Sequence, residues 1–373
     1  MTKKIFAPLF ISVFCVISCI SQENPPEVET PDQSKFTTEI IVDGLEIPWG
    51  MDFISENEIL VTEKKGILYR VTNGNKVEVS GLPEIYQRGQ GGLLDVALHP
   101  DFKNNKLIYF TAAVHLEGDP GGNTALYCAE LNGNSISNLK LFYKGKPNTK
   151  KGQHWGSRIV FDDMGHLFFA IGDRGNRDVN PQDLTRDGGK IYRLNLDGSI
   201  PDDNPFIDQE GALKAIYSYG HRNPQGITIH PKTGEVWENE HGPKGGDEIN
   251  IVQKGKNYGW PLITYGINYS GTSITDKRSM PGMEQPLYYW VPSIAPSGMA
   301  FSSSNIYKKW KGNLFVGSLK FKYLERLVLK RGKVVKREKI LDEIGRVRNV
   351  KQGPDGYLYL GVEGKGILKV IQK

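Results

Sequence analysis

The chain has 373 residues, of which 38% are hydrophobic and 24% are charged, so it can bury the core of a large globular domain. Its formal net charge is +5, and although lysines and arginines cluster between Lys320 and Lys339, no nucleic-acid-binding module accompanies them, which argues against nucleic acid as a partner. The 43 glycines and 21 prolines, without long helical periodicity, predict an all-β fold of short strands and many turns.

The N-terminal segment has the features of a lipoprotein signal. Two lysines precede an apolar run, Ile5–Ile17, that is too short for a typical transmembrane span, and Ser18 and Cys19 follow it. We therefore predict a signal peptide over residues 1–18 and acylation of Cys19, which would place the protein in the bacterial cell envelope, in contact with a membrane only through its lipid. An ordinary signal peptide cleaved nearby is the alternative. Residues 19–35, rich in proline and polar side chains, are typical of a flexible tether.

From Phe36 onward the sequence is a succession of short predicted strands separated by turns. Glu58–Val61 and Gly66–Val71 predict one hairpin. A turn rich in Asp, Asn or Gly, followed by a strand of aromatic and aliphatic residues, recurs at Phe161–Asp173, His230–Glu240, Trp310–Leu319, Gly353–Gly364 and, in a shorter version, His99–Ala113. The copies are tens of residues apart, which matches four-stranded propeller blades, and about 40 to 60 residues per blade permits six blades.

We therefore predict a single domain over residues 36–373, a six-bladed β-propeller of four-stranded antiparallel blades. A pair of β-sandwiches is the alternative. Propellers bind ligands at the mouth of the central channel, so the functional residues should be scattered along the chain on strand-connecting loops. Cys128 is the only cysteine in this domain, which excludes an intradomain disulfide, and we expect it to be a small buried side chain.

The stretch Tyr219–Pro261 carries the densest set of motifs: the pair Arg222–Asn223, a Gly-Pro step beside acidic residues, and three glycine-rich turns. This combination is typical of loops that bind a hard cation and a planar anion. The chain contains GHRNPQG, EHGPKGGDEIN, GKNYGWP and PSIAPSGMAF, and through these motifs it resembles the glucose/sorbosone dehydrogenase family, most of all its soluble aldose sugar dehydrogenases. The resemblance covers nearly the whole chain after the tether.

This resemblance implies a quinoprotein that uses pyrroloquinoline quinone (PQQ) and calcium to oxidise the C1 hydroxyl of aldose sugars to lactones. The electrons would then pass to an external acceptor that the sequence does not identify. His154, in the sequence GQHWG, matches the general base, and an imidazole suits removal of a hydroxyl proton near neutral pH. A lone histidine is by itself more often structural. The best-known branch of the family has an orienting aspartate before this histidine, where this chain has Gln153, so the orientation of the imidazole and the preference for glucose stay open.

PQQ is a flat molecule with three carboxylates, which guanidinium and ammonium groups bind well. The resemblance implies contacts with the cofactor or sugar for Gln90, Arg222, Asn223, Trp290, Lys320, Arg346 and Arg348. Of these, Arg222 and Asn223 match the pair beside the reactive carbonyl, and Trp290 matches an aromatic wall. The alternation Arg346–Val347–Arg348 predicts both guanidiniums on one side of a strand. Solvated charges and a core position for Trp290 are the alternatives.

Calcium is also implied by the resemblance, with the backbone carbonyls of Gly242 and Pro243 as ligands of the catalytic ion. Ca²⁺ accepts main-chain oxygens readily and can polarise the carbonyl that accepts a hydride. Glu248 and Tyr258, the latter through its carbonyl, match a second, structural calcium site, for which an acidic turn without metal is the alternative. No pair of His or Cys residues has the spacing of zinc ligands.

Two other functions compete with the sugar dehydrogenase. A calcium-dependent propeller lactonase would act without PQQ, and the cations Lys320, Arg346 and Arg348 argue against it because they have no purpose without an anionic cofactor. A non-catalytic, surface-tethered binding module would take up no cofactor, and the retained base and cations argue against that reading. The loop Asp173–Asp178 is either part of the sugar site or a solvated turn.

Overall fold

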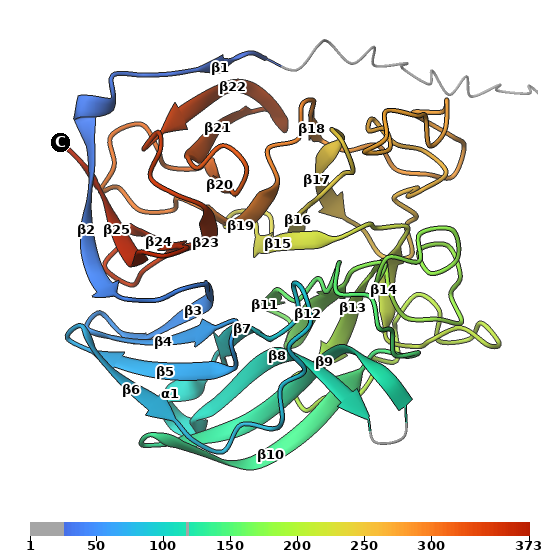
Figure 1. The fold of residues 1–373 in the computed structure, drawn as a ribbon, viewed down its shortest axis with the longest axis horizontal. Coiled ribbons are helices and arrows are strands. Elements are labelled where there is room, and N and C mark those ends of the chain that lie inside the picture. The colour runs from blue at the N-terminus through green and yellow to red at the C-terminus, as the bar shows by residue number, and fades with distance from the viewer. Residues whose placement is uncertain (1–25, 117–118) are drawn as a thin grey trace, which may run out of the picture.

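The computed structural model describes residues 26–116 and 119–373, and these residues form six sheets around a central axis (Figure 1). All pairing within the six four-stranded units is antiparallel, which confirms the predicted six-bladed propeller. The predicted signal peptide and Cys19 lie outside the described residues. Within the described part of the chain, no helix has the length and apolar character needed to cross a membrane.

The first three blades follow one another along the chain, each running from an inner strand to an outer strand. Blade 1 contains β3 (Pro48–Ser55), β4 (Glu58–Glu63), β5 (Ile67–Thr72) and β6 (Asn75–Val79). Blade 2 contains β7 (Leu93–Leu98), β8 (Leu107–Leu116), β9 (Asp119–Asn132) and β10 (Ser135–Lys144), with the short helix α1 (Phe102–Asn105) between the first two strands. Blade 3 contains β11 (Ile159–Phe161), β12 (His166–Ile171), β13 (Lys190–Asn195) and β14 (Ile216–Tyr219).

The remaining blades continue this order, and the two ends of the domain meet in the last one. Blade 4 contains β15 (Pro224–Ile229), β16 (Val236–Glu240), β17 (Asp247–Val252) and β18 (Tyr288–Trp290). Blade 5 contains β19 (Pro296–Phe301), β20 (Leu314–Ser318), β21 (Leu324–Lys330) and β22 (Lys333–Ile340). Blade 6 contains β23 (Val347–Gln352), β24 (Leu358–Val362) and β25 (Gly366–Gln372), and its outer strand is the N-terminal β2 (Phe36–Asp43). Pairing of β2 with β25 closes the ring.

The residues before β2 are attached to blade 5. β1 (Val28–Glu29) pairs in parallel with β22, and the 3₁₀ turn Gln33–Lys35 follows. The Gln33 side chain donates a hydrogen bond of 3.0 Å to the carbonyl of Lys339. Residues 28–29, which belong to the predicted tether, therefore form a fifth strand on this blade.

The recurrent sequence motif marks the same place in each blade. Its turn joins the first strand to the second, and its aromatic or aliphatic strand becomes β8, β12, β16, β20 or β24. These strands are almost entirely buried because they lie between the faces of two neighbouring blades. The predicted hairpin at Glu58–Val71 forms as β4 and β5. Cys128 is buried in β9 as predicted, and burial raises the pKa of its thiol to about 11.

Hydrophobic side chains fill the space between every pair of consecutive blades. One cluster joins blades 1 and 2 around Leu60 and Phe110, and another joins blades 2 and 3 around Tyr109 and Phe169. Four similar clusters join the remaining neighbours around the ring. Each blade therefore buries both of its faces, and the loops at the ends of the channel stand on a rigid, closed frame.

Candidate functional site

The candidate residues meet at one end of the channel because of strand direction. The first and second strands of a blade are antiparallel, so the residues before the first strand and after the second lie at the same end. Residues that precede first strands are Gln90, His154, Arg222, Asn223 and Arg346. Residues that follow second strands are Lys64, Asp173, Gly242, Lys320 and Glu363.

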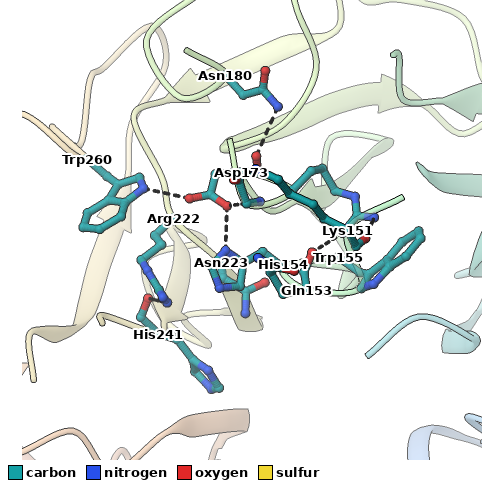
Figure 2. A network of polar contacts seen from close by, with 12 residues as sticks. Lys151, Gln153, His154, Trp155, Asp173, Asn180, Arg222, Asn223, His241 and Trp260 are labelled. Atoms are coloured by element: carbon teal, nitrogen blue, oxygen red, sulfur yellow. Dashed lines mark hydrogen bonds and ion pairs between the residues drawn. The ribbon is translucent and has the colours of Figure 1, made fainter. Parts of the chain in front are cut away.

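The centre of the site is the contact between His154 and Asp173 (Figure 2). His154 Nδ1 lies 2.6 Å from Asp173 Oδ1, which also accepts a hydrogen bond of 2.7 Å from the backbone N–H of Gly175. Trp260 Nε1 donates to the other carboxylate oxygen at 2.9 Å. The carboxylate can only accept, so it holds the ring proton on Nδ1 and leaves the lone pair of Nε2 available to take a proton.

Asp173 therefore orients the imidazole from another part of the chain. The backbone carbonyl of Gln153 accepts a hydrogen bond from Arg174, whose guanidinium stacks on the Trp155 ring at 3.4 Å. The orienting carboxylate comes from the end of β12, 19 residues after the histidine along the chain. The orienting group is thus distant from His154 in the sequence but lies beside it in the folded protein.

The electrostatic surroundings keep His154 neutral. Burial lowers its pKa, and Arg222 lowers it further, while Asp173 acts in the opposite direction. Burial by itself would raise the pKa of Asp173, but His154, their hydrogen bond and Arg222 together lower it. The site therefore presents a neutral imidazole beside a charged carboxylate, which is the protonation state that a general base requires.

The backbone at His154 is held in an unusual conformation. Its φ is +58°, in the left-handed region that non-glycine residues seldom adopt. The Gln90 amide oxygen accepts a hydrogen bond of 2.9 Å from the N–H of His154, and the N–H of Gln90 donates to the Gly152 carbonyl at 2.7 Å. A Cβ on Gly89 would lie 2.5 Å from that same carbonyl oxygen. The 89–90 loop thus fixes the loop that carries the histidine.

Arg222 and Asn223 link blades 3 and 4 at the channel mouth. Arg222 Nη1 donates to the carbonyl of His241 at 2.8 Å, and its Nε is buried without a partner among the described residues. The backbone N–H groups of both residues donate to the Glu240 carboxylate. Asn223 Oδ1 accepts a hydrogen bond of 3.3 Å from the N–H of Gly156. Arg222 is therefore a fixed cation that keeps one donor unused beside His154.

A second group of cations lies around Glu363. Arg346 Nε is 2.6 Å from one carboxylate oxygen of Glu363, and Arg348 Nε donates to the other at 3.1 Å, which confirms that both guanidiniums lie on one side of the chain. The Lys64 ammonium is close enough that, after burial, Arg348 is the main cause of its lowered pKa. Two guanidiniums and an ammonium lie near two carboxylates, because Glu46 as well as Glu363 acts on Lys64, so the group carries net positive charge. Lys320 is exposed on the next loop, whose Leu319 carbonyl accepts from Arg346 at 3.1 Å.

His241 lies between the two sets of cations. Its Nε2 is 2.6 Å from the carbonyl of Pro296, so the neutral ring donates a hydrogen bond there. Burial lowers the pKa of His241 to about 3, with Arg222, Arg348 and His154 among the further causes. The same half-buried ring is therefore within electrostatic reach of both Arg222 and Arg348. This end of the channel is an electropositive region suited to a multiply charged anion.

The Gly242–Pro243 step follows His241 and is folded tightly. Asp247 accepts a hydrogen bond of 2.9 Å from the N–H of Gly242, and it also accepts from the N–H groups of Ile294 and Ala295. A Cβ on Gly242 would lie 2.2 Å from the carbonyl oxygen of Gly246. Only glycine fits this turn. Because Pro243 lines the same cavity as His154, the step reaches the reactive part of the site.

Beneath Arg222 lies a buried cluster of acidic residues. His221 Nδ1 is 3.6 Å from Glu238 Oε1 and 3.7 Å from Glu240 Oε1, and the three potential ligand atoms lie within 4.8 Å of one another. Glu248 is next to them, since Glu240 is the main cause, after burial, of its raised pKa. His221 Nδ1, Glu238 Oε2 and Asn250 Oδ1 have no hydrogen-bond partner among the described residues. Buried carboxylates with unpaired oxygen atoms in one place are typical of a cation site.

The two residues predicted for a structural calcium lie at this cluster. Glu248 Oε2 is 3.4 Å from Asn250 Nδ2, and the ring of Tyr258 stacks on His221 with 4.5 Å between centroids. Burial and the charge of Glu240 raise the pKa of Glu238 to about 7. Mutual repulsion of these carboxylates is relieved when a cation binds them.

The cavity above His154 has a volume of about 260 Å³. Its lining includes Lys151, Gln153, His154, Asp173, Asn176, Arg177, Arg222, Pro243, Trp260, Asn268 and Tyr269. The loop Asp173–Asp178 therefore belongs to the site.

The structure places Trp290 elsewhere: it is 1% exposed, packs between blades 4 and 5, and donates to Glu325 at 3.1 Å. Trp260 and Tyr269 supply the aromatic lining of the cavity above His154, whereas Trp290 borders a separate cavity that Lys320 also lines.

Sequence reasoning did not single out several of these residues, and it named Asp173 only as the start of a loop that could line the sugar site. Lys64, Asp173 and Glu363 each come directly after or soon after the second strand of a blade, so the repeated motif itself could have pointed to them. Glu238 and Glu240 alternate on β16, which places both on one face of the strand. Trp260 lies outside the repeated motif, in the long connection between β17 and β18, and its only sequence signal is the GKNYGWP motif that contains it.

Comparisons of the sequence with known proteins identify related sugar dehydrogenases. A sequence model of the family described as glucose / sorbosone dehydrogenase matches residues 45–369. The chain is 43% identical to the aldose sugar dehydrogenase YliI of Escherichia coli K12, over 86% of this chain and 88% of that protein. It is 30% identical to the quinoprotein glucose dehydrogenase B of Acinetobacter calcoaceticus, over 80% and 67% respectively.

Solved structures of aldose sugar dehydrogenases superpose on this chain over most of its length. The apo form of the soluble aldose sugar dehydrogenase from Escherichia coli superposes with a TM-score of 0.87 at 40% identity, over 91% of this chain and 100% of that one. The PQQ-bound aldose sugar dehydrogenase from Streptomyces coelicolor superposes with a TM-score of 0.73 at 26% identity, over 90% and 98%.

Proposed function

Since the chain belongs to the glucose/sorbosone dehydrogenase family, we propose that it oxidises the C1 hydroxyl of aldose sugars to lactones with PQQ as its cofactor. The observation that carries this proposal is the His154–Asp173 pair, which presents a neutral imidazole in a cavity bordered by Arg222. Oxidation of an alcohol removes one proton and one hydride, and the imidazole supplies the acceptor for the proton.

The cations at this end of the channel fit PQQ. When bound, PQQ supplies the two-electron acceptor for the hydride. Arg346, Arg348, Lys64 and Lys320 would hold its carboxylates, because the group around Glu363 carries more positive than negative charge. Arg222 keeps a buried Nε without a partner, so it has a donor available for an anionic oxygen.

The roles of the chain's own residues in the reaction follow from their contacts. His154 Nε2 takes the proton of the C1 hydroxyl, and Asp173 holds the ring in the tautomer that leaves Nε2 free. The imidazolium that forms is stabilised by the same carboxylate. Gln90 and the 89–90 loop keep His154 in its left-handed conformation, so the base is positioned before the sugar arrives.

We also propose that the protein binds Ca²⁺ in two places. The carbonyls of Gly242 and Pro243 would hold the ion at the cofactor, and the tight 242–246 turn supports this role because it leaves room only for backbone. Glu238, Glu240 and Glu248 would hold the second ion, which the unpaired buried acceptors beside them support. Calorimetric titration of chelator-treated protein with Ca²⁺ tests this proposal, with two binding events expected.

For the cell-envelope location we propose a lipid anchor at Cys19, supported by the basic, apolar and Ser-Cys order of the first 19 residues. The reduced cofactor would pass its electrons to an external acceptor. Expression of the full chain and of its Cys19→Ala variant tests the anchor: the wild type should partition into detergent and the variant into the aqueous phase.

The activity is tested with protein freed of cofactor and then supplied with PQQ, Ca²⁺, glucose or xylose, and a dye as acceptor. We expect dye reduction by the wild type and its loss in His154→Ala. His115→Ala, which removes an exposed histidine, is the matched control and should remain active. Absence of turnover with every aldose would reject the proposed function.

A further inference from the structure

The side chain of Arg158, the residue directly before β11, lies in the central channel, which the first strands of the blades surround (Figure 1). Its guanidinium donates to backbone carbonyls of three other blades: to Trp49 in blade 1 at 2.7 Å, to Gln225 in blade 4 at 2.9 Å and to Arg348 in blade 6 at 2.7 Å. Asp95 in blade 2 accepts from the same guanidinium at 3.1 Å. One buried side chain of blade 3 therefore contacts four other blades.

Each of the three carbonyls belongs to a residue at a β-bulge. The pairing of the first strand with the second shifts its register around Trp49, Gln225 and Arg348, so these residues have no partner in the ladder. A buried carbonyl without a hydrogen bond is destabilising, and Arg158 supplies the missing donor at all three bulges. Each carbonyl is bonded by a different nitrogen of the planar guanidinium, an arrangement that the single nitrogen of a lysine cannot reproduce.

One side of this network lies under the group of cations around Glu363. The carbonyl of Arg348 accepts from Arg158, while its side chain pairs with Glu363 and lies 4.5 Å from the centre of the Trp49 ring. The ring N–H of Trp49 donates to Ser157 Oγ at 2.9 Å. Arg158 therefore holds both the backbone of Arg348 and the residue on which the Arg348 guanidinium stacks.

The other side of the network reaches the loop of the general base. The carbonyl of Gln225 accepts from Arg158, and its side-chain amide donates to Asn223 Oδ1 at 3.2 Å. Asn223 Oδ1 also accepts a hydrogen bond of 3.3 Å from the N–H of Gly156, two residues after His154. The same guanidinium thus connects the two halves of the site, which lie on opposite sides of the channel mouth.

We propose that Arg158 is a positioning residue that holds the Arg348 and Asn223 sides of the site at a fixed separation and thereby sets the affinity for PQQ. This inference rests on the proposed function. Asp95 keeps the guanidinium in place and balances its charge in the buried channel. Arg158 acts only through the backbone carbonyls that it binds, and a misplacement of about 1 Å transmitted in this way can lower a rate about a hundredfold.

The channel also gives access to Arg158 from the end away from the base. A cavity of about 340 Å³ is lined by Arg158, by Asp95 and by residues at the ends of the first strands, including the exposed Pro231 and Ser303. The first strands start at the His154 end, so their last residues lie at the opposite end of the channel. A guanidinium ion can therefore reach the space left by Arg158→Ala without passing through the site of the cofactor.

The test is an absorbance titration of cofactor-free protein with PQQ in the presence of Ca²⁺. In Arg158→Ala the Kd for PQQ should rise about tenfold, equivalent to about 1.4 kcal/mol. Guanidinium chloride, far below denaturing concentrations, should restore the affinity, and sodium chloride at the same concentration should not. Arg158→Lys keeps the charge beside Asp95 and serves as the second variant if the alanine variant does not fold; it should also bind PQQ less tightly.

The matched control is Arg193→Ala. Arg193 is another buried arginine, 3% exposed, which pairs with Asp203 on the third strand of blade 3. Its loss should lower Tm without changing the affinity for PQQ. Unchanged affinity in the Arg158 variants, an equal loss of affinity in Arg193→Ala, or a loss in Arg158→Ala that guanidinium does not reverse overturns the inference.

A structural readout separates this inference from the proposed function. Crystal structures of the cofactor-free wild type and of Arg158→Lys should differ in the separation between Arg348 and Asn223. Failure of the wild type to take up PQQ would reject the proposed function, and the two structures would then decide the role of Arg158. A changed separation supports the positioning role, and an unchanged separation overturns it.

Discussion

Replacing Asp173 by Asn keeps the size of the side chain but removes its charge and one acceptor. In the native site Oδ1 accepts from His154 and Gly175, and Oδ2 accepts from Trp260. An amide accepts on one side only, so in either orientation its NH₂ group faces an N–H donor, that of Trp260 or that of Gly175. When it faces Gly175 it also donates to His154 Nδ1, which moves the ring proton to Nε2 and prevents Nε2 from taking the substrate proton.

The magnitude follows from the bond that is lost. A hydrogen bond to a charged group contributes about 1.5–3 kcal/mol, and about 1.36 kcal/mol changes a rate tenfold. We therefore expect kcat/KM for glucose to fall about ten- to a hundredfold in Asp173→Asn. Asp173 also raises the pKa of His154, so its neutralisation lowers that pKa further. Because His154 acts in its neutral form, the acid limb of the pH profile should move to lower pH.

The assay is dye reduction by the protein loaded with PQQ and Ca²⁺, measured from acidic to neutral pH. Asp163→Asn changes an exposed carboxylate on the turn between β11 and β12 and is the matched control. Calorimetric unfolding of each variant checks that the fold is retained. A wild-type rate in Asp173→Asn, or an acid limb that moves to higher pH, would refute the assignment of Asp173 as the orienting group.

Three further outcomes are expected. Gly242→Ala places a Cβ 2.2 Å from the carbonyl oxygen of Gly246, so denaturant unfolding should show a loss of about 1–3 kcal/mol. In chelator-treated protein the pKa of His221 is about 9 and that of Glu238 is about 7, both above the ordinary values of these side chains. Their protonated forms therefore stabilise the fold at acidic pH, and this stabilisation is lost as the pH rises towards 9, so Tm should fall over that range. Added Ca²⁺ should restore the Tm of the wild type more than that of Glu238→Gln. Arg348→Ala should weaken PQQ uptake, followed by absorbance titration, whereas the exposed Arg331→Ala should not.

The repeated turn-and-strand motif predicted the architecture, with a pair of β-sandwiches as the alternative. Its aromatic and aliphatic strands are buried between neighbouring blades, and its spacing limits how many blades the chain can form. Local alternation also predicted Arg346 and Arg348 on one side of the chain, and both contact Glu363, although Arg346 lies just before β23 and the strand pairing shifts register at Val347.

The contacts between residues of different blades could not be predicted from the sequence, because they depend on the closed ring. Asp173 reaches His154 because the end of β12 and the loop before β11 share one end of blade 3, and Trp260 completes the carboxylate's contacts from blade 4. Trp290 borders a separate cavity from that of His154 because its blade packs against the next. The sequence alone thus determines which residues form strands and which face each side chain takes, since these properties are local. Only the tertiary structure decides which loop ends meet, because strand order and blade packing set distances between residues far apart in the chain.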